Sequence, residues 1–179
     1  MAKLTVIVGI AGSGKSSLCA DLAQVRNVKV FEDATLVNSD RRRAGYDCLG
    51  ELVARLLGCK EDCIMEESYL TMEQFRNTFK KFCDEHLRGV TQDWIFFKND
   101  PVRCINNVFH DMYVEIKERD HSSRLRALLG QIEGYVVPAK GEFPGHDLPR
   151  DVFQLESPTF TEKHEALDWL RKEISRLPH

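Results

Sequence analysis

The sequence lacks the features that mark membrane, secreted and repetitive proteins. No apolar run is long enough for a membrane-spanning helix or a signal sequence, because the stretch near the N-terminus is interrupted by Gly9, Gly12 and Lys15. The formal net charge is −3, so no overall field draws the chain to DNA or to an anionic membrane. Internal repeats and low-complexity segments are also missing. These absences predict a cytoplasmic protein that does not bind membranes.

The sequence also lacks the residue spacings of common metal sites. Its six cysteines are scattered, and the closest pair, Cys59 and Cys63, forms C-x-x-x-C without a second pair. Its six histidines include no H-E-x-x-H or comparable ligand pair. We therefore expect free, buried thiols in a reducing compartment and no structural metal site.

Length and hydrophobic patterning indicate one α/β domain. A chain of 179 residues, 42% of them hydrophobic, can bury one core, so we expect a single domain over residues 1–179. Strand-like and helix-like segments alternate, which is typical of a parallel sheet with helices on both faces and ligands beyond the carboxyl ends of its strands. The expected strands are residues 3–8, 28–33, 63–68, 93–100 and 152–156, and the expected helices include residues 101–118 and 161–177.

Residues 8–17, VGIAGSGKSS, follow the first expected strand and contain a phosphate-binding pattern. Gly9, Gly14, Lys15 and Ser16 fit G-x-x-x-x-G-K-[ST], the Walker A motif. In this motif backbone N–H groups surround a phosphate chain, the lysine reaches the β- and γ-phosphates, and the serine hydroxyl binds Mg²⁺. Glycine lets the backbone approach the phosphate oxygens, and the next helix directs its positive end at them. The nucleotide-binding residues predicted in the loop are Gly9, Ala11, Gly12, Ser13, Gly14, Lys15, Ser16 and Ser17.

Acidic residues at the ends of two expected strands are candidates for the chemistry of phosphoryl transfer. Asp33 ends the second strand and is either the base that accepts the proton of an acceptor hydroxyl or a turn residue. Glu66 and Glu67 end the third strand and are candidates to hold metal-bound water. Neighbouring strand residues point to opposite faces, so at most one of the two faces the metal, and we favour Glu67. Asp33 and Glu67 are also candidate acceptor-binding residues.

Two groups of arginines have a functional and a purely structural interpretation. Arg119, Arg124 and Arg126 lie in a segment, roughly residues 112–135, that we interpret as a small lid. They either close over the phosphates, with Arg119 catalytic and Arg124 and Arg126 on the nucleotide, or form a solvated helix face. Arg41 and Arg42 either hold an acceptor phosphate or are exposed to solvent.

The order of these motifs resembles that of the small P-loop kinases, which include nucleoside, nucleotide, shikimate and gluconate kinases and the kinase part of bacteriophage polynucleotide kinase. The likeness rests on GIAGSGKSS, the acid after the second strand, EESYL after the third, and WIFFKNDPVRCINNV. It implies a three-layer P-loop NTPase fold whose five-stranded parallel sheet has the order 2-3-1-4-5, with a small lid. It also implies ATP and Mg²⁺ as cofactors, Lys15 and Ser16 on the donor, and Asp33 as general base. The chain departs from the group in having glutamate for the Walker B aspartate, and CINNVFHD without the arginines expected early in the lid.

We therefore predict a kinase that moves the γ-phosphoryl group of ATP to a hydroxyl or phosphate of a small, nucleoside-like acceptor. A polynucleotide 5′-hydroxyl kinase is one alternative, although a long nucleic acid is not the favoured partner. A regulatory protein that binds ATP or GTP without transferring phosphate is another. A GTPase is disfavoured because DCLG, at residues 47–50, follows no apolar strand-like run and N-K-x-D is absent.

Overall fold

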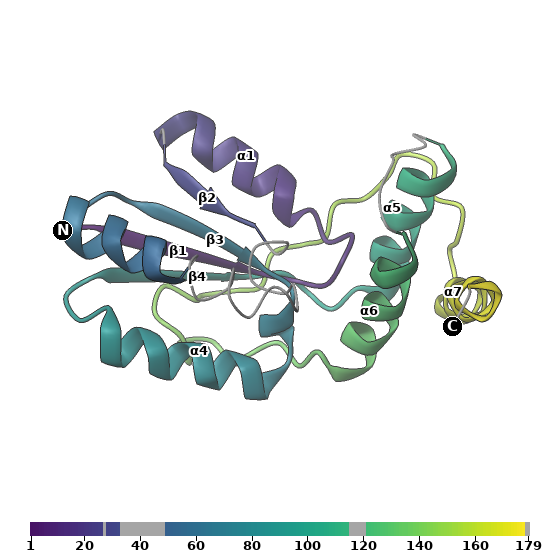
Figure 1. Cartoon of the computed structure of the whole chain (residues 1–179). Helices are drawn as coiled ribbons and strands as arrows, with labels where there is room; N and C mark the ends of the chain where they lie inside the picture. The colour runs from purple at the N-terminus through teal and green to yellow at the C-terminus, as the bar shows by residue number, and fades with distance from the viewer. Residues whose placement is uncertain (27, 33–48, 115–120, 178–179) are drawn as a thin grey trace.

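The computed structural model describes residues 1–26, 28–32, 49–114 and 121–177 (Figure 1). Within these residues, four parallel strands form one sheet in the order β2-β3-β1-β4. They are β1 (Lys3–Val8), β2 (Lys29–Phe31), β3 (Cys63–Glu67) and β4 (Thr91–Phe96). Both β1 and β3 are buried along almost their whole length, as strands covered on both faces must be. The α/β class, the parallel sheet and the order of its first four strands are confirmed.

Helices cover both faces of the sheet, which gives three layers (Figure 1). The helical elements are α1 (Lys15–Arg26), η1 (Ala54–Cys59), η2 (Tyr69–Thr71), α4 (Glu73–His86), α5 (Pro101–Tyr113), α6 (His121–Gly134) and α7 (Lys163–Arg176). On one face, Cys19 of α1 joins Ile64 of β3 in a buried cluster. On the other, Phe79 of α4 packs edge-on against Trp94 of β4. Among the described residues, no helix is both long enough and apolar enough to cross a membrane.

The helices α5, α6 and α7 form a second unit beside the sheet, which we call the helical cluster (Figure 1). It has its own buried core, which includes Cys104 and Val108 of α5, Leu125 and Leu128 of α6, and Leu170 of α7. Ile10, from the loop after β1, belongs to the same core, so the cluster packs directly against that loop. Pro101 begins α5, as expected, because its fixed φ and missing N–H suit the first helical position. The expected helix at residues 161–177 is confirmed as α7.

The fifth strand expected at residues 152–156 is not a strand in the structure. The chain there makes a single parallel bridge, between Arg150 and the residue that follows β4. Pro149, next to the bridge, has no N–H group to donate to a ladder. Farther on, the Phe153 carbonyl accepts a hydrogen bond from the Asn107 side chain rather than from a strand. Among the described residues the sheet therefore has four strands instead of the five expected, and the segment after Arg150 turns toward the helical cluster.

Candidate phosphate-binding site

The loop between β1 and α1 takes its shape from its glycines. Gly12 and Gly14 have φ angles of 81° and 95°, in the left-handed region that glycine adopts without strain. A Cβ atom at Gly12 would also overlap the carbonyl oxygen of Cys104 in α5. The N–H of Ser13 donates to the carbonyl of Ile10 at 3.1 Å and closes the turn. Gly12 thus brings the loop backbone close to α5 of the helical cluster.

Lys15 and Ser16 are the first residues of α1, at the positive end of the helix. Lys15 is 5% exposed, and its Nζ donates to the carbonyl of Ile10 at 3.3 Å. The Oγ of Ser16 donates to Oε1 of Glu66 at 2.9 Å. The other carboxylate oxygen, Oε2, is buried and has no hydrogen-bond partner among the described residues. An ammonium, a hydroxyl and a carboxylate therefore meet at the start of the helix.

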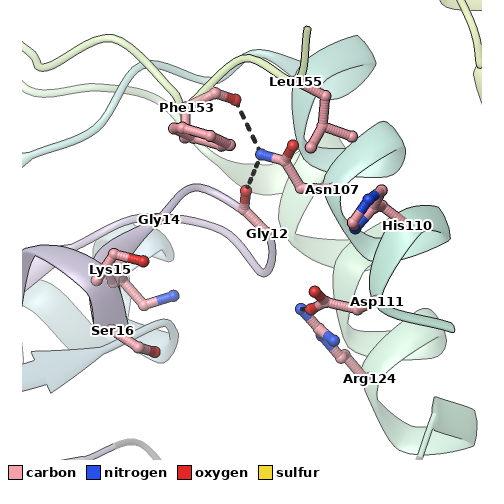
Figure 2. Close-up of a pocket in the computed structure, with 11 residues that line it drawn as sticks. Gly12, Gly14, Lys15, Ser16, Asn107, His110, Asp111, Arg124, Phe153 and Leu155 are labelled. Atoms are coloured by element: carbon pink, nitrogen blue, oxygen red, sulfur yellow. Dashed lines mark hydrogen bonds and ion pairs between the residues drawn. The ribbon is translucent and has the colours of Figure 1, made fainter. Parts of the chain in front are cut away.

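A cavity of about 290 Å³ lies between this loop and the helical cluster (Figure 2). Figure 2 shows Lys15 and Ser16 on one side, with α5 and α6 on the other. The Nη2 of Arg124, from α6, forms an ion pair with Oδ2 of Asp111, from α5, at 2.8 Å. Besides residues of the loop, the cavity is lined by Asn107, His110, Asp111, Arg124, Phe153 and Leu155. The cavity therefore has cations on both sides, which suits an anionic ligand.

Two side-chain amides of the helical cluster hold the backbone of the loop. The Nδ2 of Asn107 donates to the carbonyl of Gly12 at 2.8 Å and to that of Phe153 at 2.9 Å (Figure 2). The Oε1 of Gln131, a buried residue of α6, accepts from the N–H of Ala11 at 2.9 Å. Because these amides bind consecutive loop residues, they fix the two sides of the cavity relative to each other.

The structure brings most of the predicted nucleotide-binding residues together. Those that line the cavity are Gly12, Gly14, Lys15, Ser16 and Ser17 of the loop and Arg124 of the expected lid. Gly9, Ala11 and Ser13 are not among the lining residues, and Gly9 instead packs tightly against Ser13. Arg126 is exposed and also lies outside the lining, which differs from its predicted position on the nucleotide. The reason is helical spacing, since Arg126 follows Arg124 by two positions and faces away from it.

Glu66, and not the favoured Glu67, is the acid beside Ser16. Alternation along β3 directs Glu66 toward α1 and Glu67 toward the opposite face. There the Oε1 of Glu67 accepts from the N–H of Tyr69 at 2.9 Å, and Glu67 lines a different hollow. The sequence-based reasoning that only one of the two can face the loop thus agrees with the structure, but its choice of residue does not.

Four predicted site residues lie outside the described part of the chain: Asp33, Arg41, Arg42 and Arg119. The expected general base, the expected acceptor contacts of the arginines and the expected catalytic arginine therefore stay predictions from the sequence.

The sequence reasoning missed the α5 side of the cavity. Asn107, His110 and Asp111 lie at positions i, i+3 and i+4 of a helix whose other face is buried. This polar stripe is a readable signal, because residues with that spacing share one face of a helix. Phe153 and Leu155 have no such signal, since they come from an irregular segment that only the tertiary fold brings to the cavity.

Among the described residues, no cysteine lines the cavity. Within the described residues, the cysteines that are free and buried, as the sequence predicts, are Cys19, Cys63, Cys83 and Cys104, whereas Cys59 is free but exposed. Burial, followed by the charge of Glu66, raises the pKa of the Cys19 thiol well above its usual range. Cys19 is therefore neutral at physiological pH and is neither a nucleophile nor a thiolate ligand beside the loop.

Comparison with known proteins finds similarity in structure alone. No family model matches the chain, and no curated protein matches it. A gluconokinase from Sinorhizobium meliloti has a TM-score of 0.55 and 18% identity, with 97% of this chain and 94% of that one covered. A fungal RNA kinase has a TM-score of 0.60 and 11% identity, with coverage of 98% and 86%. A sugar kinase from Janibacter has a TM-score of 0.52 and 14% identity, with both chains covered over 100% of their length.

At these identities the likeness shows the fold and nothing finer. The chain has the fold of the P-loop kinases over nearly its whole length. The acceptor of any one neighbour is not carried over by such a likeness, because one fold serves many substrates.

Proposed function

We propose that this chain, which has the P-loop kinase fold, is a phosphotransferase that moves the γ-phosphoryl group of ATP to a small, nucleoside-like acceptor. One observation carries the proposal: the Walker A loop with Lys15 and the guanidinium of Arg124 line opposite sides of one cavity. Phosphoryl transfer needs cations and oriented N–H groups around the migrating group more than it needs covalent help. The loop would hold the donor phosphates, Lys15 would neutralise charge near the γ-phosphate, and Arg124 would approach from the other side.

The residues beside the loop also fit a magnesium ion. Mg²⁺ prefers oxygen ligands and is bound through one or two protein groups together with substrate phosphates and water. Ser16 and Glu66 offer a hydroxyl and a carboxylate, and one oxygen of Glu66 is buried without a partner among the described residues. When bound, Mg²⁺ would neutralise phosphate charge, while Ser16 and Glu66 would hold its position.

An apolar hollow at the end of β3 supports a nucleoside-like acceptor. It has a volume of about 270 Å³ and is lined by Leu49, Met65, Leu70 and Phe79, with Glu67, Tyr69 and Phe75. The rings of Tyr69 and Phe75 meet edge to face, 5.9 Å apart, and both side chains are partly exposed. A flat base can stack on such rings, whereas a polyol would place its hydroxyls against apolar walls without partners. As general base we retain Asp33, whose role stays a prediction from the sequence.

A screen of phosphoryl acceptors tests the proposal. The protein is incubated with γ-labelled ATP, Mg²⁺ and a panel of nucleosides, nucleotides, sugars and 5′-hydroxyl oligonucleotides. We expect label on a nucleoside or nucleotide, at a rate above that of ATP hydrolysis without acceptor. Slow hydrolysis with no labelled acceptor would instead favour the regulatory nucleotide-binding protein, and labelled sugar alone would exclude the nucleoside-like class.

A polynucleotide acceptor is the second candidate, because the motifs of the sequence also resemble those of the kinase part of bacteriophage polynucleotide kinase. The effect of salt concentration on acceptor binding distinguishes a polynucleotide from a small acceptor. Binding of an oligonucleotide through several phosphates weakens steeply as salt is raised. A flat response of the Michaelis constant between low and physiological salt would favour the small acceptor.

A further inference from the structure

We propose that Asp111 is a positioning residue, which holds Arg124 so that one nitrogen of its guanidinium faces the phosphates of the bound nucleotide. This inference rests on the proposed function, since it concerns the same cavity. It assigns to α5 a part in organising the site that the Walker A loop alone does not supply.

The two terminal nitrogens of the Arg124 guanidinium have different surroundings. Nη2 lies 2.8 Å from Oδ2 of Asp111, and both side chains are only 18% exposed. Nη1 is buried and has no acceptor among the described residues. Figure 2 shows the Arg124–Asp111 pair across the cavity from Lys15. Asp111 therefore holds one nitrogen of the guanidinium, and the other is a buried donor without an acceptor among the described residues, in a side chain that lines the cavity.

A phosphate oxygen would supply the acceptor that Nη1 lacks. A buried donor without an acceptor is destabilising, and pairing with an ionised oxygen removes that penalty with a strong, charge-assisted bond. The planar guanidinium can bind two oxygens side by side, so Asp111 need not release Nη2 when a phosphate binds Nη1. Asp111 would thus fix the plane and direction of the arginine before the nucleotide arrives.

The positions of the two charges on their helices support a role beyond helix stability. Asp111 lies in the last turn of α5, where the negative end of the helix disfavours an acid. Arg124 lies in the first turn of α6, where the positive end disfavours a cation. Each charge is therefore unfavourable at its own helix end. The ion pair offsets this unfavourable interaction only when α5 and α6 pack against each other. Departures of this kind are expected at functional sites.

A double-mutant cycle tests the inference. Asp111→Ala, Asp111→Asn, Arg124→Ala and the double alanine variant are compared in kcat, in KM for ATP and in affinity for tripolyphosphate measured by calorimetry. We expect Arg124→Ala to lower kcat on the order of 10²-fold, as the loss of a cation at the migrating group does. Asp111→Ala should lower kcat by roughly tenfold through misplacement of the arginine. Asp111→Asn, whose side-chain oxygen still accepts from Nη2, should stay within about threefold of the wild type.

The decisive result is the double variant. If Asp111 acts through Arg124, Asp111→Ala has no further effect on kcat or tripolyphosphate affinity once Arg124 is alanine. Multiplicative effects of the two substitutions, or a gain of activity in Asp111→Ala, would overturn the inference. The matched control is Asp84→Ala, which removes an exposed ion pair on α4 and should leave all three quantities unchanged.

The same measurements separate this inference from the proposed function. A wild-type protein that phosphorylates an acceptor but shows no coupling between the two residues keeps the function and rejects the role of Asp111. Conversely, coupling in tripolyphosphate affinity without phosphorylation of any acceptor keeps the role of Asp111 and rejects the kinase.

Discussion

The two sides of the cavity are assembled in different ways. The sheet side is local, because Gly12, Lys15 and Ser16 are close neighbours in the chain and follow directly from β1. The helical side comes from α5, α6 and the segment after the Arg150 bridge, and the contact between Gln131 and Ala11 joins residues 120 positions apart. A local pattern can therefore predict the phosphate loop, whereas the charges that face it depend on how distant segments pack.

Removing Lys15 is the strongest test of the sheet side. Lys15→Ala should lower turnover by a factor on the order of 10² or more, because a cation near the migrating phosphoryl group is lost. We expect the protein to stay folded, because the hydrogen bond that Nζ donates to the carbonyl of Ile10 is long, at 3.3 Å. Steady-state kinetics and thermal unfolding measure the two effects. The control is Lys98→Ala, which removes a surface ion pair with Asp151, and an unchanged rate in Lys15→Ala would reject the loop as the donor site.

A substitution at Gly12 disrupts the contact between the loop and α5, which joins the two sides of the cavity. Gly12→Ala should lower the free energy of unfolding by about 2 kcal/mol or more, because alanine is strained at positive φ and its Cβ would overlap the Cys104 carbonyl. Gly130→Ala is the matched control, because Gly130 lies inside α6 with nothing near its added Cβ. It should raise the free energy of unfolding by about 0.5–1 kcal/mol. Urea unfolding measures both, and equal effects of the two substitutions would mean that the loop does not pack on α5.

Much of the fold was predictable from the sequence, because its signals are local. The apolar runs of β1 and β3 and the proline that begins α5 each follow from residues next to one another. The prediction of a fifth strand was wrong for a reason that lies outside the segment itself. Residues 152–156 have a strand-like pattern, but the carbonyl of Phe153 is taken by Asn107 of α5 and no ladder forms.

The candidate site was predictable only in part, because only some of its residues are neighbours in the sequence. The spacing of Gly9, Gly14, Lys15 and Ser16 suffices to predict a phosphate loop, because the motif is contiguous. The choice between Glu66 and Glu67 needs the face of β3 that α1 covers, which is a property of the assembled sheet. Asp111 was missed because its partner, Arg124, belongs to another helix.

The Glu66 and Glu67 pair offers a test within a single strand. Glu66→Gln should raise the Mg²⁺ concentration needed for half-maximal activity by roughly tenfold, because a carboxylate at the proposed metal site is lost. Glu67→Gln should leave the magnesium requirement unchanged and alter KM for the acceptor, since Glu67 lines the apolar hollow. Magnesium titrations of the two variants at saturating ATP measure the difference. A larger magnesium effect in Glu67→Gln would restore the assignment made from the sequence.

The smallest expected effect concerns Gln131, which joins α6 to the loop. Gln131→Ala leaves the N–H of Ala11 without its acceptor and should lower the free energy of unfolding by about 1 kcal/mol. The loop would still have its glycines and its contact with Asn107, so binding of tripolyphosphate should weaken by no more than about threefold. Gln74→Ala, at an exposed position of α4, is the control and should change neither quantity. If Gln131→Ala abolished binding altogether, the loop would depend on the helical cluster for its shape, and the distinction between a local and an assembled side would fail.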